Sequence, residues 1–114
     1  MYEYKCTILR HIDADTSRCE IDVGFDITAK LTIRWEGIDA PEMSTEDGNV
    51  AKAALLEKLP EGSVCTLRTT KLRKEKYGRY VGTFISKDGI NVNDWLVKEG
   101  FAKLYPSVTK EDNA

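Results

Sequence analysis

The residues whose types and spacing suit chemistry lie in three short stretches of the sequence: residues 11–16, 34–42 and 76–79. Hard divalent cations such as calcium prefer oxygen ligands, and Asp15, Asp39 and the backbone carbonyl of Ala40 offer them. Phosphoryl transfer also needs cationic side chains around the developing charge and a group that orients or deprotonates water. Three side chains meet these needs: Arg34, Arg79 and Glu42. The stretches together hold the groups that hydrolysis of a phosphodiester bond requires.

Each stretch also has an ordinary structural interpretation. Asp13 and Asp15 can shape a turn through hydrogen bonds between their side chains and the backbone. Arg34 can pair with Glu36 or Glu20 across a sheet. A single stretch of this kind would decide little, whereas three in this order favour the chemical interpretation.

Apolar periodicity predicts the elements that position these side chains. Apolar and polar residues alternate, as in half-buried strands, over five segments: residues 4–12, 16–23, 29–37, 63–72 and 79–86. A first helix is predicted over residues 46–59, with Ser44 among its start signals, and a second is predicted between Asn91 and Gly100. This order fits an α+β, mainly β fold: a five-stranded OB-fold Greek-key barrel with two helices packed outside.

Length and charge limit the alternatives. A chain of 114 residues suits one domain, which we expect over residues 1–105, followed by a polar, flexible tail at 106–114. The net charge of −2 argues against a protein that coats nucleic acid, although residues 71–79 have a local excess of Lys and Arg. A solvated hairpin is the alternative interpretation of that excess.

The cysteines and the N-terminus bear on the compartment. Three cysteines without a Cys-x-x-Cys pair, beside one histidine, argue against a zinc module. The odd cysteine count, and an N-terminus without a basic region followed by a long apolar core, argue against a signal peptide. No apolar stretch approaches the roughly 20 residues that span a bilayer. We therefore expect a cytoplasmic protein, monomeric and without a membrane partner.

The order of the motifs resembles the staphylococcal (thermonuclease-like) nuclease family over residues 4–105. The family typically shows an Asp-Gly-Asp-Thr step, an Arg followed by Gly-Ile-Asp-Ala-Pro-Glu, a helix, and a Tyr-Gly-Arg. A last stretch resembles Val-Asn-x-x-Leu-Val-x-x-Gly-x-Ala. The corresponding segments of this sequence are residues 13–16, Arg34 with 37–42, 77–79 and 92–102.

This resemblance implies a calcium-dependent nuclease that cuts phosphodiester bonds in DNA or RNA and leaves a 3′ phosphate. Asp15 and Asp39 correspond to the calcium carboxylates, and the backbone oxygen of Ala40 completes the ligands that the protein supplies directly. Glu42 corresponds to the general base, or to the group that orients the attacking water.

Other positions correspond to groups that bind the substrate. Arg34 and Arg79 match the two guanidinium groups that hold the scissile phosphate, a task that suits the planar fork of arginine. The positions that contact the nucleotide correspond to Tyr77, Tyr105 and Lys76.

The sequence departs from the family pattern at two positions near this constellation. Ala14 replaces the usual glycine, which is harmless at negative φ and costly in the left-handed region. Glu36 stands where a small or apolar residue is usual, and it shares a strand face with Arg34, so it can pair with that arginine. The hairpin between Thr16 and Arg34 is also a few residues longer than in the secreted founding member.

Two other classes of function stay open. A catalytically silent nucleic-acid-binding OB-fold module would need exposed aromatic side chains on the barrel, whereas Trp35 and Phe84 fall at predicted core positions. A protein-interaction domain would be expected to have lost several of the five polar side chains, and this sequence has them all: Asp15, Arg34, Asp39, Glu42 and Arg79.

Overall fold

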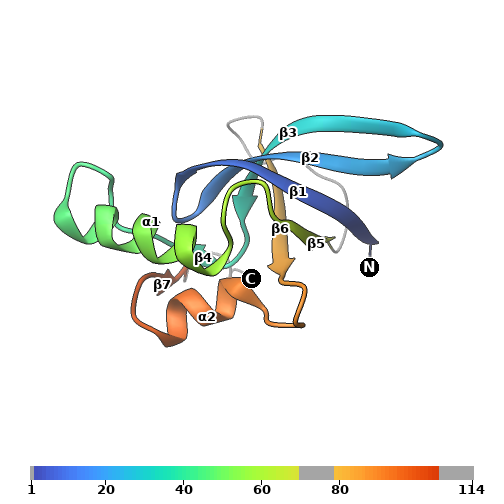
Figure 1. Cartoon of the computed structure of the whole chain (residues 1–114). Coiled ribbons are helices and arrows are strands. Elements are labelled where there is room, and N and C mark those ends of the chain that lie inside the picture. The colour runs from blue at the N-terminus through green and yellow to red at the C-terminus, as the bar shows by residue number, and fades with distance from the viewer. Residues whose placement is uncertain (1, 70–78, 106–114) are drawn as a thin grey trace, which may run out of the picture.

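A closed barrel of five strands forms the centre of the protein (Figure 1). The structure is a computed structural model that describes residues 2–69 and 79–105. The barrel strands follow the order β1-β2-β3-β6-β5, with β3 and β6 parallel and all other neighbours antiparallel. Their bounds are Tyr2–Asp13 (β1), Thr16–Gly24 (β2), Ile27–Trp35 (β3), Val64–Thr69 (β5) and Tyr80–Ile85 (β6). The predicted fold class, a mainly β barrel with outer helices, is confirmed.

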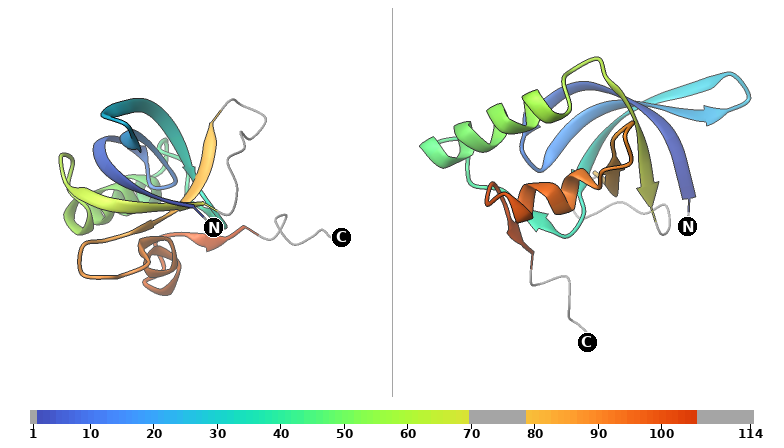
Figure 2. Two further views of the ribbon diagram at one scale, coloured as in Figure 1. Left: turned by 90° about the vertical axis from the view of Figure 1, so that its right-hand side faces the viewer. Right: turned by 60° about the horizontal axis from the view of Figure 1, so that its bottom comes forward.

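Two helices and a small second sheet lie beside the barrel. Helices α1 (Glu46–Lys58) and α2 (Val92–Lys98) lie on the side away from the tip of the β2–β3 hairpin (Figures 1 and 2). The second sheet pairs β4 (Ile38–Asp39) with β7 (Lys103–Leu104) in antiparallel register. This sheet was not predicted, because two-residue strands are too short to show alternation. Neither helix has the length and apolar character of a transmembrane span in the described ranges.

The helix ends confirm most of the predicted signals. Helix α1 begins after Thr45, whose hydroxyl accepts a hydrogen bond from the backbone N–H of Gly48 at 3.1 Å. Among the predicted start signals, Thr45 and not Ser44 is therefore the N-cap, and the predicted start at residue 46 is confirmed. Asn91 caps α2 as predicted, and Gly100 adopts the left-handed conformation with φ of 84°.

The barrel core contains the apolar residues that alternation placed inside. Trp35 and Phe84 are fully buried and stack with ring centroids 4.2 Å apart. The three cysteines, Cys6, Cys19 and Cys65, are buried free thiols. The predicted core positions of both aromatic rings are confirmed, so neither ring is available for stacking on a nucleic-acid base.

A buried polar chain ties the end of α1 to three barrel strands. The Nε2 atom of His11 lies 2.8 Å from the carbonyl of Leu59, which can only accept, so Nε2 carries the proton. Nδ1 then accepts from the hydroxyl of Ser17 at 2.7 Å, and that oxygen accepts from the indole N–H of Trp35 at 2.9 Å. The side-chain nitrogen and oxygen atoms of His11, Ser17 and Trp35 all have partners, and Trp35 directly follows Arg34 on β3.

The β2–β3 hairpin extends well beyond the barrel (Figure 1). Phe25 and Asp26 at its tip both have positive φ, 57° and 60°, which is the conformation of a two-residue type I′ turn. The side chain of Phe25 is 97% exposed. The chain therefore holds a bulky residue in a backbone conformation that favours asparagine or glycine.

Candidate active site

The end of the barrel that joins β1, β2 and β3 gathers two carboxylates around one guanidinium group. Thr16 and Arg34 are register partners on β2 and β3, which places the β1–β2 turn beside Arg34. Nη1 of Arg34 lies 3.6 Å from Oδ2 of Asp15, and Nη2 lies 3.6 Å from Oδ1 of Asp39. Charge-assisted hydrogen bonds are shorter, about 2.7–2.9 Å. Both ion pairs are thus loose contacts.

Backbone carbonyls hold Arg34 more tightly than the carboxylates do. Its Nη1 donates to the carbonyl of Trp35 at 2.9 Å and to that of Asp15 at 3.3 Å. The ring of Tyr105 lies 5.7 Å from the guanidinium carbon, within the range of a cation–π contact. Glu36 forms no ion pair with Arg34, so the suggested pairing across the strand face was wrong. Nη1 thus anchors the guanidinium to the backbone, and Nη2 points toward Asp39.

The two aspartates of the Asp13-Ala14-Asp15 step have different roles in the structure. Asp13 shapes the turn, because its Oδ1 accepts from the backbone N–H of Asp15 at 3.0 Å. Burial, followed by the neighbouring Asp15 carboxylate, raises the pKa of Asp13 to about 6. Asp15 instead reaches the residue that follows β4, where its Oδ2 accepts from the N–H of Ala40 at 2.8 Å. Ala14 does not have positive φ, so its replacement of glycine introduces no backbone strain.

Thr16 links the second arginine to this cluster. Nη1 of Arg79 donates to the Thr16 hydroxyl at 3.3 Å, and that hydroxyl donates to Oδ1 of Asp15 at 3.2 Å. Thr16 was not predicted to be a site residue. Its signal was its position directly after the second aspartate of the motif. The structure therefore brings both arginines and both aspartates into one cluster.

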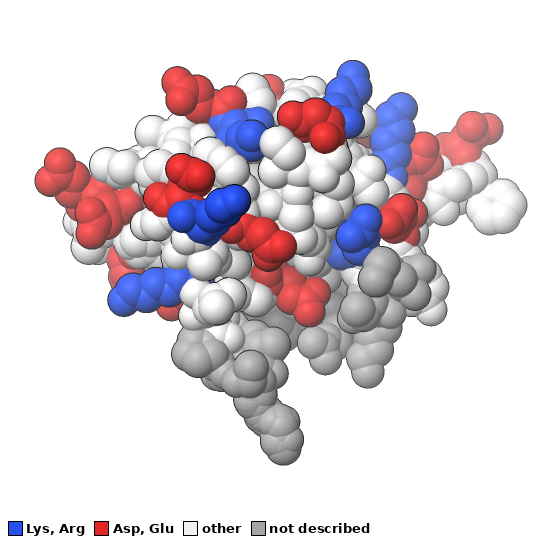
Figure 3. Space-filling model, turned by 90° about the horizontal axis from the view of Figure 1, so that it is seen from below, with Lys and Arg blue, Asp and Glu red and all other residues white. Residues whose placement is uncertain are grey.

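Glu42 lies on a groove that begins at this cluster. The groove has a volume of about 570 Å³ and is lined by Asp39, Ala40, Pro41, Glu42, Asp47, Val50, Gly100, Phe101, Ala102 and Lys103. Glu42 is exposed, and within residues 2–69 and 79–105 its carboxylate forms no hydrogen bond or ion pair. On the face that carries α2, acidic and basic side chains are interspersed (Figure 3). The Glu42 carboxylate is thus open to solvent and to a ligand.

The donors in the cluster suit a hard cation better than zinc. No group of three or more His, Cys, Asp or Glu side chains gathers in the part of the chain that the structure describes. A cation held by Asp15 and Asp39 would complete its shell with backbone oxygen and water, which is the coordination that calcium tolerates. The oxygen donors of Asp15 and Asp39 are thus of the kind that a hard cation binds. The guanidinium of Arg34 already lies near both carboxylates, so a cation bound there would share their negative charge with it.

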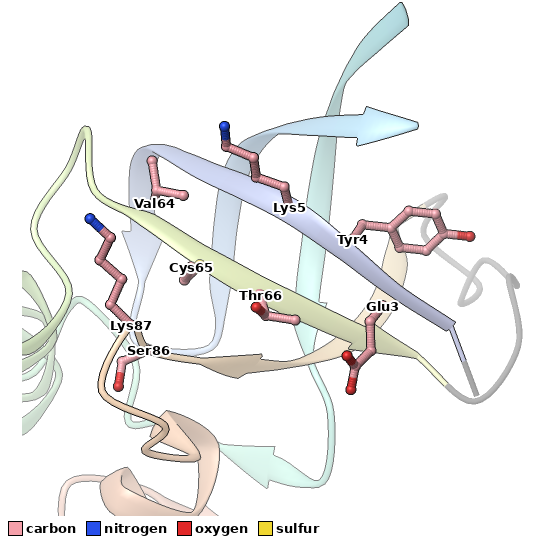
Figure 4. Close-up of a pocket in the computed structure, with 8 residues that line it drawn as sticks. All are labelled: Glu3, Tyr4, Lys5, Val64, Cys65, Thr66, Ser86 and Lys87. Atoms are coloured by element: carbon pink, nitrogen blue, oxygen red, sulfur yellow. The ribbon is translucent and has the colours of Figure 1, made fainter. Parts of the chain in front are cut away.

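Other candidates are placed in part. Tyr105 lies against Arg34, whereas Tyr77 and Lys76 lie outside the described residues. A second hollow lies over β1 and β5, with Lys5 and Lys87 at its sides (Figure 4). None of the predicted site residues lines that hollow.

Comparisons with known proteins identify the family of the chain. The family described as "Staphylococcal nuclease homologue" matches residues 32–114, a range that includes Arg34, Asp39, Glu42 and Arg79 but not Asp15. A protein of Escherichia coli O157:H7 named "Uncharacterized endonuclease" is 33% identical over 98 residues, which cover 86% of this chain and 59% of that protein.

Two further relatives carry related names. "Endonuclease YhcR" of Bacillus subtilis (strain 168) is 31% identical over 114 residues, covering 90% of this chain and 9% of that protein. "Probable staphylococcal-like nuclease CAN1" of Oryza sativa subsp. japonica is 39% identical over 79 residues, covering 69% of this chain and 23% of that protein. The chain thus spans less than two thirds of each of these relatives. From the barrel, the cluster and these matches, the chain belongs to the staphylococcal nuclease family.

Proposed function

We propose that this protein is a calcium-dependent endonuclease that hydrolyses phosphodiester bonds in DNA or RNA. The observation that supports the proposal most is the cluster in which Arg34 lies 3.6 Å from both Asp15 and Asp39, with Arg79 linked to it through Thr16. The names of the relatives agree, since they include "Uncharacterized endonuclease" and "Endonuclease YhcR".

The two arginines bind the scissile phosphate. Among the described residues, Nη2 of Arg34 donates to no backbone carbonyl and has only the loose contact with Asp39, so it can donate to a phosphate oxygen. Arg79 reaches the cluster through its hydrogen bond to the Thr16 hydroxyl. Planar guanidinium groups donate parallel hydrogen bonds, which strengthen as negative charge builds up on the phosphate oxygens. Both groups therefore favour the transition state over the bound substrate.

Asp15, Asp39 and the backbone oxygen of Ala40 hold calcium. When bound, calcium supplies positive charge that neutralises the phosphate and polarises water. Asp15 also fixes Ala40 by accepting its N–H, so one carboxylate serves both the ligand site and the loop that leads to Glu42. Glu42, exposed on the groove, orients or deprotonates the attacking water. Tyr105, Tyr77 and Lys76 contact the nucleotide.

The test uses a closed circle of single-stranded DNA, a duplex plasmid and RNA, each incubated with calcium and then with chelator. Linear fragments from the circle, formed only with calcium, are the expected result, because an endonuclease needs no free end. Asp39→Asn should lower the rate and the calcium affinity together, while Asp94→Asn, an exposed change on α2, should alter neither. A folded protein that binds calcium and cuts none of the three would refute the proposal.

A further inference from the structure

The segment that carries Glu42 is held by the first turn of α1. We propose that Thr45 and Gly48 are positioning residues for Glu42, because they clamp its backbone against the helix; this inference rests on the proposed role of Glu42. The exposed Glu42 carboxylate has no protein partner among the described residues. Among the described residues, only the Glu42 backbone is fixed by the protein, so that backbone sets the region that the carboxylate can reach.

Thr45 supplies two of the clamp's hydrogen bonds. Its backbone N–H donates to the carbonyl of Glu42 at 2.9 Å, and its hydroxyl donates to the same carbonyl at 2.6 Å. The same hydroxyl oxygen accepts from the N–H of Gly48 at 3.1 Å. One side chain thus caps the helix and fixes the carbonyl of Glu42, so the helix start and the Glu42 backbone are coupled.

Gly48 provides the space that the clamp needs. A Cβ atom added to Gly48 would lie 2.6 Å from the carbonyl carbon of Glu42 and 3.0 Å from the nitrogen of Met43, and closer still to the Glu42 oxygen. All three are backbone atoms, so no side-chain rotation relieves the clash. Gly48 has helical φ, and helix propensity alone favours alanine at a helical position. Close backbone approach is therefore what requires glycine here.

The segment is fixed on both sides of Pro41. On one side, the N–H of Ala40 donates to Asp15 in the barrel cluster at 2.8 Å. On the other side, Thr45 holds Glu42, and the side chain of Asn49 donates to the carbonyl of Met43 at 3.3 Å. The clamp therefore sets the position of Glu42 relative to Asp15 and its neighbours. A shift of about 1 Å in a group that positions a nucleophile can lower a rate by about 100-fold.

The experiment compares Gly48→Ala and Thr45→Val with the conservative Thr45→Ser, which keeps the hydroxyl. In Gly48→Ala and Thr45→Val, kcat should fall about tenfold or more, while KM and the calcium affinity stay within about twofold of wild type. Thr45→Ser should retain most of the rate. Asn91→Ala, which removes the cap of α2 without touching Glu42, controls for the general loss of a helix cap.

A cycle with Glu42→Gln separates positioning from general destabilisation. If Gly48 acts through Glu42, Gly48→Ala should slow the wild type strongly and slow the Glu42→Gln protein little. Equal fold losses in both backgrounds would overturn the inference, as would wild-type kcat in folded Gly48→Ala and Thr45→Val. If Glu42→Gln itself cuts at the wild-type rate, the proposed role of Glu42 fails first, which distinguishes the two failures. Thr45→Val keeps the test open if Gly48→Ala does not fold.

Discussion

Arg34 lies 3.6 Å from the carboxylate of Asp15 while its hydrogen bonds go to backbone carbonyls. The guanidinium thus neutralises a proposed calcium ligand without using up the lone pairs of that ligand. Arg34 and a bound cation would both interact with the carboxylates of Asp15 and Asp39. The guanidinium and a cation bound to the same carboxylates would repel each other, and the low dielectric of a partly buried site strengthens that repulsion.

Removal of the guanidinium should therefore change calcium binding and cleavage in opposite directions. Arg34→Gln should bind calcium roughly three- to tenfold more tightly in the absence of nucleic acid. The same variant should cut at least about 100-fold more slowly, because a transition-state contact is lost. Isothermal calorimetry and a cleavage assay measure the two effects. Arg68→Gln removes an equal charge from an ion pair with Glu3 and is the control; weaker calcium binding in Arg34→Gln would contradict the account.

The Thr16 hydroxyl should matter for cleavage through Arg79. Thr16→Val keeps the shape of the side chain but removes the bonds to Arg79 and Asp15, so we expect a rate about tenfold lower. Thr32→Val removes a similar bond, from Arg18, at the next register pair along the same face of β2 and β3, without touching Arg79 or Asp15. Single-turnover rates of both variants check the prediction. An equal loss in Thr32→Val would show that Thr16 has no special part.

Because His11 is buried in its neutral form, the free energy of unfolding should fall as the pH becomes acidic. Burial lowers the pKa of His11 below its usual 6.5, against the opposing effects of the Leu59 carbonyl and Glu61. The unfolded chain then takes up the proton first, so this contribution to stability is complete above about pH 6.5 and is lost as pH falls through the folded pKa.

Urea unfolding of wild type and His11→Gln between about pH 5 and 8 isolates the effect of His11. The difference in free energy of unfolding should shrink toward acid, because only the wild type carries this histidine. Asp13, whose pKa is raised, acts in both proteins and cancels in the difference. A difference that is independent of pH would contradict a neutral, buried His11.

A turn sequence that favours positive φ at the tip of the β2–β3 hairpin should stabilise the protein. Phe25 and Asp26 occupy positive φ, where Asn-Gly is preferred. Replacement of the pair by Asn-Gly should raise the free energy of unfolding by about 1 kcal/mol, with cleavage unchanged. Chemical denaturation measures the gain. Lower stability would show that Phe25 makes contacts that outweigh its strained backbone.

The sequence predicted the barrel because period-two alternation depends on local side-chain order. The five barrel strands and both helices stand close to their predicted ranges, and Trp35 and Phe84 lie in the core. The β4–β7 sheet was missed because its pairing of Asp39 with Lys103 joins residues far apart in the chain. The domain boundary at residue 105, the cytoplasmic location and the monomeric state stay predictions.

The candidate site was predictable in its residue types but not in its pairings. Hard oxygen donors and arginines are visible in a sequence, and their order carried the resemblance to the family. Contacts such as Arg34 with Asp15 depend on the register of β2 against β3, which no local pattern specifies. The need for glycine at position 48 likewise could not be predicted, because it arises from the close approach of α1 to the Glu42 backbone.

The most direct test of the proposed function is the single-turnover cleavage rate of Glu42→Gln at saturating calcium, beside Glu57→Gln on the exposed face of α1 as the matched control. Glu42→Gln should bind calcium like wild type and cut at least about 100-fold more slowly, since it loses the group that acts on water. Glu57→Gln should cut at the wild-type rate. Undiminished cleavage by Glu42→Gln would contradict the account.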